Sequence, residues 1–176
     1  MARFLQLRIQ LRHTKVWRCI AIPADATFAG LHNAIQEAFG WDDSHLYEFR
    51  QGSDTLAASP YHESFDGSPM PNAESVKLKR FLKKPAERCE YEYDFGDSWV
   101  HDIKVEEITV LPIGSPWFLD GEFTAPPEDC GGVPGYERLL EVYRTGKDPW
   151  GEDPEEIIEW AGDWTPDSFV RGQLPR

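Results

Sequence analysis

Apolar and polar residues alternate at the start of the chain. Between residues 3 and 11, Leu5, Leu7, Ile9 and Leu11 occupy every second position, with polar residues between them. A period of two is typical of a strand with one buried face. Residues 12–15 then turn the chain, and residues 16–22 predict an antiparallel partner. Pro23 ends this second strand because proline cannot donate a hydrogen bond to the ladder.

After Pro23 the spacing of the apolar residues changes from every second position to that of a helix. Thr27 is a suitable N-cap, and Gly40 suits a left-handed stop. The apolar residues between them fall on one side at helical spacing: Phe28, Leu31, Ile35, Ala38 and Phe39. Residues 45–50 return to alternation, which predicts a strand with His45 and Tyr47 on one face and Glu48 on the other.

The second half of the chain adds a hairpin and two helices. Residues 51–75 read as an irregular excursion with one short strand, and residues 110–132 as a long loop. Residues 76–84 fit either a strand or a short helix, and Pro85 as a stop favours the helix. Helices are predicted from Pro134 to Gly146 and from Asp153 to Gly162. The sequence therefore predicts one α+β domain over residues 1–176. Its sheet is mixed or antiparallel and built from hairpins, with one helix after the first hairpin and two C-terminal helices.

The stretch YEYDFGDSWVHDIKVE (residues 91–106) predicts the central hairpin. A two-residue loop would place Tyr93 and Trp99 on opposite faces. A three-residue loop at 96–98 pairs Phe95 with Trp99 and Tyr93 with His101, so that all the large rings share one face. Because a slip of one residue flips every side chain, burial of these rings favours the odd-numbered loop.

Composition and charge limit the function classes. The 176 residues carry a net charge of −13, and residues 89–176 alone contain 6 Lys/Arg against 21 Asp/Glu. Such an acidic surface repels phosphate backbones, which disfavours nucleic-acid binding. Two basic stretches remain: Arg3, Arg8, Arg12, Lys15 and Arg18, and Lys77, Lys79, Arg80, Lys83, Lys84 and Arg88. No apolar run approaches the roughly 18 residues of a membrane span. The three scattered cysteines favour a reduced, cytoplasmic location.

Two segments repeat one pattern around a histidine. WDDSHLYEF and GDSWVHDIKV each run from an Asp-Ser turn into a strand with a histidine among aromatic residues. If these strands are neighbours, the histidines meet in an aromatic-walled pocket for a small ligand. Its candidate residues are His45, Tyr47, Glu48, Tyr93, Asp97, Trp99 and His101. Taken singly, each histidine is more typical of a core residue, with His101 bonded to Tyr93 and His45 beside Tyr47.

Motifs for catalysis or cofactor binding do not occur in the sequence. It has no Cys-x-x-Cys or His-x-x-x-His pair, and no G-x-S-x-G, P-loop or G-x-G-x-x-G motif. Cys130 stands beside Asp129, whose charge raises a thiol pKa and lowers its reactivity. We therefore expect no cofactor and no metal, and the sequence favours a protein without enzymatic activity.

Three long blocks resemble one family. WRCIAIPADATFAGLHNAIQEAFGWDDSHLYEF, YEYDFGDSWVHDIKVE and PPEDCGGVPGYERLLEV are similar, in order, to the signature blocks of plasmid pRiA4b ORF-3-like proteins. The resemblance implies a mixed α/β domain found in plasmids and in bacterial or archaeal genomes, without an established activity. Some members are called passenger TnpR proteins of an insertion element. Many members carry further cysteines before PPEDCGG, where this chain has Phe118 and Ala125, so a four-ligand zinc site is not expected.

The sequence favours a non-enzymatic binding or accessory protein, linked to mobile elements, with a groove for a small molecule or a protein partner. One alternative is a metal-assisted hydrolase that uses His45, His101 and nearby carboxylates. A second alternative is a nucleic-acid accessory factor that uses the basic N-terminal strands.

Overall fold

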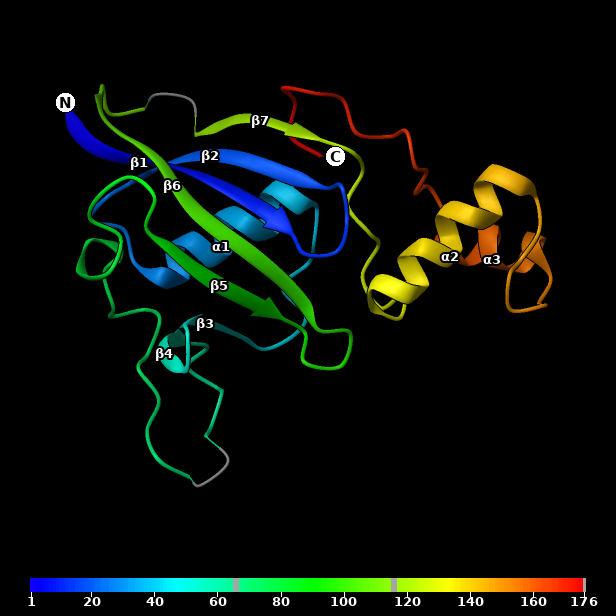
Figure 1. Cartoon of the computed structure of the whole chain (residues 1–176), viewed down its shortest axis with the longest axis horizontal. Helices are drawn as coiled ribbons and strands as arrows, with labels where there is room; N and C mark the ends of the chain where they lie inside the picture. The colour runs from blue at the N-terminus through cyan, green and yellow to red at the C-terminus, as the bar shows by residue number, and fades with distance from the viewer. Residues whose placement is uncertain (65–66, 115–116, 176) are drawn as a thin grey trace.

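The computed structural model describes residues 1–64, 67–114 and 117–175. Its strands are β1 (Ala2–Leu11), β2 (Trp17–Pro23), β3 (Tyr47–Gln51), β4 (Asp54–Ala58), β5 (Arg88–Tyr93), β6 (Trp99–Leu111) and β7 (Phe118–Glu122). Its α-helices are α1 (Phe28–Phe39), α2 (Gly132–Thr145) and α3 (Pro154–Ala161). The strands form one antiparallel sheet in the order β4-β3-β5-β6-β1-β2-β7 (Figure 1). The predicted α+β class is confirmed, with the antiparallel form of the sheet.

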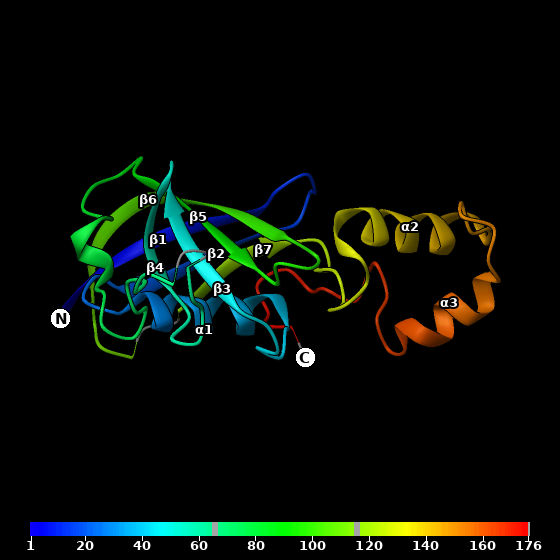
Figure 2. The same ribbon diagram turned by 90° about the horizontal axis from the view of Figure 1, so that it is seen from below.

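One face of the sheet is covered by α1 (Figure 2). Leu5, Leu7, Ile9 and Leu11 of β1 are buried on this face, while the polar residues between them remain partly exposed. This alternation is the pattern expected of an antiparallel sheet with a single covered side. The core therefore lies between α1 and the inner face of the sheet.

The helix α1 forms as its caps predict. The Thr27 hydroxyl accepts a hydrogen bond from the Gly30 amide at 3.0 Å, and Gly40 ends the helix with φ 76°. Its buried side also contains two polar residues, His32 and Gln36, which lie one turn apart. Both side chains form hydrogen bonds with the Tyr91 hydroxyl.

The β5–β6 hairpin has the predicted face but a different register. Tyr93 pairs with Trp99 and Tyr91 pairs with His101, so the loop is five residues long, from 94 to 98. Asp94 stabilises the turn by accepting a hydrogen bond from the Gly96 amide at 2.9 Å. The odd loop length keeps the rings together on the inner face, whereas Phe95 is exposed.

The predictions for residues 76–84 and 110–132 were wrong. Residues 76–84 form only one 3₁₀ turn, Leu78–Arg80, because the Leu78 and Lys79 amides bond to carbonyls of the 24–26 segment instead of a preceding helical turn. The predicted loop at 110–132 contains β7, which extends the sheet by pairing with β2. The parts of the predicted loops at residues 65–66 and 115–116 lie outside the described residues.

The helices α2 and α3 lie beyond one end of the sheet (Figure 1). α2 begins at Gly132, two residues before the predicted start, and Gly146 ends it with φ 68°. The Asp153 carboxylate caps α3 by accepting from the Glu155 amide at 2.9 Å. Within the described ranges, no helix is both long and apolar enough to cross a membrane.

Candidate functional site

Three loops that are distant in sequence meet at the end of the sheet nearest α2. They are residues 41–46 before β3, residues 94–98 between β5 and β6, and residues 126–132 before α2. The Trp41 indole donates to the Pro126 carbonyl at 2.9 Å. The Glu128 carboxylate accepts from the Asp42 amide at 2.8 Å and from the Tyr93 hydroxyl. Each of the three blocks quoted above thus contributes one loop to this junction.

Glycines allow the second and third loops to approach closely. The Gly131 amide donates to the Asp97 carboxylate at 3.0 Å, and Gly132 adopts φ 68°. A Cβ atom at Gly132 would lie 2.5 Å from the Asp97 carbonyl oxygen. Gly132 is therefore required by the contact between the loops as well as by its backbone conformation, whereas Gly131 is required by its φ of 91° alone.

His45 lies between two aspartates at this junction. Its Nε2 atom is 3.0 Å from Asp129 Oδ1 and 3.7 Å from Asp94 Oδ2. One possible ligand atom from each of His45, Asp94 and Asp129 lies within 4.8 Å of the other two. Asp94 is buried, His45 is half-buried and Asp129 is exposed. His101 is not part of this group.

A second polar network, which the sequence analysis missed, connects α1 to the loop before β3. Gln36 Nε2 donates to the Tyr91 hydroxyl at 3.0 Å, which leaves the Tyr91 proton for His32 Nδ1 at 2.7 Å. His32 Nε2 then donates to Asp43 at 2.7 Å, and the Asp43 amide donates to Gln36 at 2.9 Å. Burial lowers the pKa of His32, although the neighbouring Asp43 carboxylate opposes this change. His32 is therefore a neutral member of a closed ring of hydrogen bonds.

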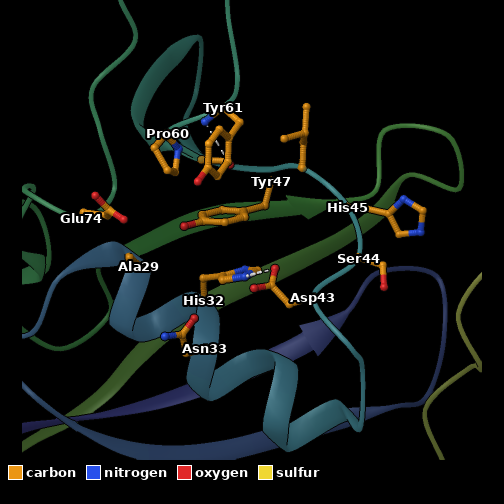
Figure 3. Close-up of a pocket in the computed structure, with 12 residues that line it drawn as sticks. Ala29, His32, Asn33, Asp43, Ser44, His45, Tyr47, Pro60, Tyr61 and Glu74 are labelled. Carbon is orange, nitrogen blue, oxygen red and sulfur yellow. Dashed lines mark hydrogen bonds and ion pairs between the residues drawn. The ribbon is translucent and has the colours of Figure 1, made fainter.

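A cavity of about 500 Å³ opens beside this network (Figure 3). It is lined by α1, by residues 43–47 and 59–61, and by Glu74. The Tyr47 ring stacks on His32 with a centroid separation of 3.6 Å, and Figure 3 shows Tyr61 and Pro60 on the opposite side of Tyr47. Burial, together with the charges of Asp43 and Glu74, raises the pKa of Tyr47 to about 12. Its hydroxyl is therefore protonated at neutral pH.

The predicted site residues do not all come together. β5 lies between β3 and β6, so the strands assigned to His45 and His101 are not neighbours. Tyr47, Tyr93 and Trp99 form one row across the inner face of the sheet. Trp41 packs against this row, with its ring centroid 5.3 Å from that of Tyr93. The space expected to form a groove between the two strands is therefore filled by protein.

His101 is a core residue, but its partner differs from the predicted one. It is fully buried, and its Nδ1 lies 3.0 Å from the Trp99 carbonyl oxygen and not against the Tyr93 hydroxyl. Burial lowers the pKa of His101 to about 3. Glu48 points to the opposite face of the sheet, where its carboxylate pairs with Arg50 at 3.2 Å. Of the predicted seven residues, only His45 and Tyr47 line the cavity.

Several arginines of the basic stretches are not free to bind an anion, and Cys130 is not a reactive thiol. Arg18 is fully buried, and Arg12 pairs with Asp102 at 2.5 Å. The two stretches touch where the Arg3 guanidinium donates to the Lys83 carbonyl at 3.1 Å. Burial, reinforced by the charges of nearby aspartates, raises the pKa of the Cys130 thiol to about 12, so it is a poor nucleophile.

Comparisons with known proteins agree with the resemblance of the three blocks. An uncharacterized protein of Sinorhizobium fredii (strain NBRC 101917 / NGR234), y4hQ, is 36% identical over 166 residues, which cover 92% of this chain and 82% of that protein. The crystal structure of MM3350, a protein of unknown function from Methanosarcina mazei Go1, superposes with a TM-score of 0.78 at 30% identity. The match covers 96% of this chain and 94% of the other. The family model for plasmid pRiA4b ORF-3-like proteins matches residues 3–173. The chain therefore belongs to the plasmid pRiA4b ORF-3-like family.

Proposed function

We propose that this protein is a non-enzymatic binding module whose cavity beside Tyr47 accepts a small organic cation, such as an alkylammonium compound. The proposal rests on the charge of the lining. Asp43 and Glu74 contribute carboxylates, and no lysine or arginine is among the described lining residues. A cation entering this cavity therefore meets an attractive potential, whereas an organic anion is repelled.

The shape and the aromatic lining support the same ligand class. A cavity of about 500 Å³ is within the range of about 300 to 1,000 Å³ that is common for small-molecule sites. Tyr47 and Tyr61 provide π-faces, which attract ammonium groups by cation–π interaction. The Tyr47 hydroxyl has no hydrogen-bond partner among the described residues, so it is available to a ligand.

The network beneath the cavity favours binding over catalysis. His32 is the histidine stacked on Tyr47, but both of its ring nitrogens are already engaged, with Tyr91 and Asp43. A general base needs a nitrogen within hydrogen-bond reach of the proton that it removes. His32 supports the floor of the cavity in its present arrangement and leaves no ring nitrogen for a substrate.

The test compares matched ammonium and carboxylate probes. Isothermal titration in the presence of a chelator measures binding of butylammonium, tetramethylammonium and butyrate to the full chain. We expect the ammonium probes to bind and butyrate not to bind. Glu74→Gln and Tyr61→Ala should each weaken ammonium binding several-fold, because one removes a carboxylate and the other an exposed aromatic wall.

Glu63→Gln is the matched control, since it makes the same charge change in the same excursion but outside the cavity lining. It should leave ammonium binding unchanged. The proposal would be wrong if butyrate bound as well as butylammonium. It would also be wrong if neither ammonium probe bound, or if all three variants had equal effects.

A further inference from the structure

We propose that His45, Asp94 and Asp129 form a binding site for one divalent transition-metal ion, either Zn²⁺ or Mn²⁺. This site goes beyond the proposed organic-cation cavity, because neither aspartate lines that cavity. Figure 3 shows the His45 ring pointing away from Tyr47 and Tyr61, at the edge of the cavity. The metal would bind on the outer side of His45, at the junction of the three loops.

The separations among the candidate ligand atoms suit a common metal ion. Atoms held about 2.1 Å from one ion are about 3.0 to 3.4 Å apart when their directions are perpendicular or tetrahedral. His45 Nε2 lies 3.0 Å from Asp129 Oδ1 and 3.7 Å from Asp94 Oδ2. The 3.7 Å separation corresponds to a wide ligand–metal–ligand angle, on the order of 120° at a bond length of about 2.1 Å, while the exposed Asp129 side chain has room to rotate. His45 already directs one nitrogen at both carboxylates.

Asp94 provides a second observation that favours a cation at this place. The residue is 8% exposed, and its Oδ1 atom accepts from the Gly96 amide. Its Oδ2 atom, on the His45 side, has no hydrogen-bond donor among the described residues and lies too far from His45 Nε2 for a hydrogen bond. The His45 imidazole, 3.7 Å away, is the one ion-pair partner of this largely buried carboxylate among the described residues, so the oxygen is positioned to coordinate an ion.

The surroundings of the cluster also lack positive side chains. In the described part of the chain, Asp94 and Asp129 form ion pairs only with His45, and no lysine or arginine pairs with either. Glu128 and Asp97 stand at the same junction and add to its negative potential. A divalent ion would relieve the repulsion between carboxylates that now share one imidazole.

The donor set selects among metals. An imidazole nitrogen favours Zn²⁺ over Mg²⁺ and Ca²⁺, while carboxylates also suit Mn²⁺. Three protein ligands leave at least one position for water or for another molecule. The hydrogen bond from Gly96 to Asp94 orients that carboxylate, as outer contacts do in established metal sites.

The experiment measures metal binding by the full chain after chelator treatment. Electron paramagnetic resonance follows Mn²⁺ binding, and thermal unfolding follows stabilisation by Zn²⁺. We expect one Mn²⁺ per chain and a Zn²⁺-dependent rise in Tm. Asp129→Asn and Asp94→Asn should each lower Mn²⁺ affinity at least about tenfold, because each removes a ligand charge.

Asp42→Asn is the matched control, because it removes an exposed carboxylate from the same junction but outside the cluster. It should leave the affinity unchanged. If Asp94→Asn does not fold, the exposed Asp129→Asn variant still decides the matter. The proposal fails if the wild-type chain binds no Mn²⁺ at millimolar concentration and its Tm does not rise with Zn²⁺. It also fails if Asp42→Asn weakens binding as much as Asp129→Asn. Because the butylammonium titration is made with chelator present, failure of one site does not imply failure of the other.

Discussion

At the scale of single residues, burial sets the protonation state of His101. The ring is enclosed by the side chains of Phe39, Trp41 and Tyr91, and its Nε2 atom has no hydrogen-bond partner in the described part of the chain. Burial lowers its pKa from 6.5 to about 3, and the backbone of Tyr91 and of Trp99 only partly offsets this change. The folded protein therefore holds His101 neutral over a pH range in which the unfolded chain binds a proton.

We expect His101 to make the folded state less stable in acid. Between pH 6.5 and about pH 3 the unfolded chain holds one more proton, so the free energy of unfolding falls as the pH falls. The full slope for one proton is about 1.4 kcal/mol per pH unit. His101→Phe removes this contribution, so its urea-unfolding free energy should depend less on pH, by up to that slope, between about pH 4 and about pH 6. Equal slopes in the two proteins would contradict the prediction, because the titrating carboxylates are common to both.

At the scale of elements, the glycines at the start of α2 determine how that helix joins the hairpin. Gly132 and Gly146, at opposite ends of α2, share the same φ of 68°. The difference between them lies in their surroundings. A Cβ atom at Gly132 would meet the Asp97 carbonyl, whereas nothing lies within 4 Å of a Cβ atom at Gly146.

Alanine substitutions at these two glycines separate backbone strain from loop contact. Gly146→Ala should lower the free energy of unfolding by about 1 kcal/mol, the cost of a left-handed conformation with a side chain. Gly132→Ala should cost at least about 1 kcal/mol more, because the loops must also move apart. Urea denaturation of both variants measures the difference. Equal destabilisation would show that the contact with Asp97 has no energetic weight.

The elements with local signals were those that the sequence predicted best. α1 carries its own cap, apolar stripe and stop, so it formed as predicted. The helix predicted at residues 76–84 and the loop predicted where β7 forms were wrong. The structure of both segments depends on partners distant in sequence, the 24–26 segment and β2. The odd number of loop residues correctly predicted which side chains of the hairpin share a face. The register depended on Asp94 and Ser98 adopting positive φ, which the alternation of apolar and polar residues does not reveal.

The candidate site was harder to predict, because it depends on the order of the strands in the sheet. With β5 between β3 and β6, His45 and His101 are separated. His45 instead faces Asp94 and Asp129, residues that the sequence presents as turn formers. His32 had a detectable signal, since it and Gln36 are polar residues one helical turn apart on an otherwise apolar helix face.

At the scale of the whole molecule, the chain is divided between a sheet with α1 and a smaller helical pair. The large core extends across the inner face of the sheet, whereas Leu139, Val142 and Ile157 form a separate small cluster between α2 and α3. After α3 the chain returns to the sheet, where the Phe169 ring covers the Arg18 guanidinium at 3.9 Å. The helical pair therefore depends on limited packing and on its two connections to the sheet.

We expect α3 to open more readily than the sheet. Ile157 is the one described residue of α3 that is buried, while α1 buries seven residues and β1 lies between β2 and β6. Local opening is favoured where few apolar groups are buried. Hydrogen–deuterium exchange at neutral pH should therefore show faster exchange for the amides of residues 158–161 than for the ladder amides of β1. The helix α1 is the control, because a helix packed on the sheet should exchange slowly. If α3 were protected as long as β1, its stability would have to come from contacts beyond the Ile157 cluster, and the molecule would unfold as one unit.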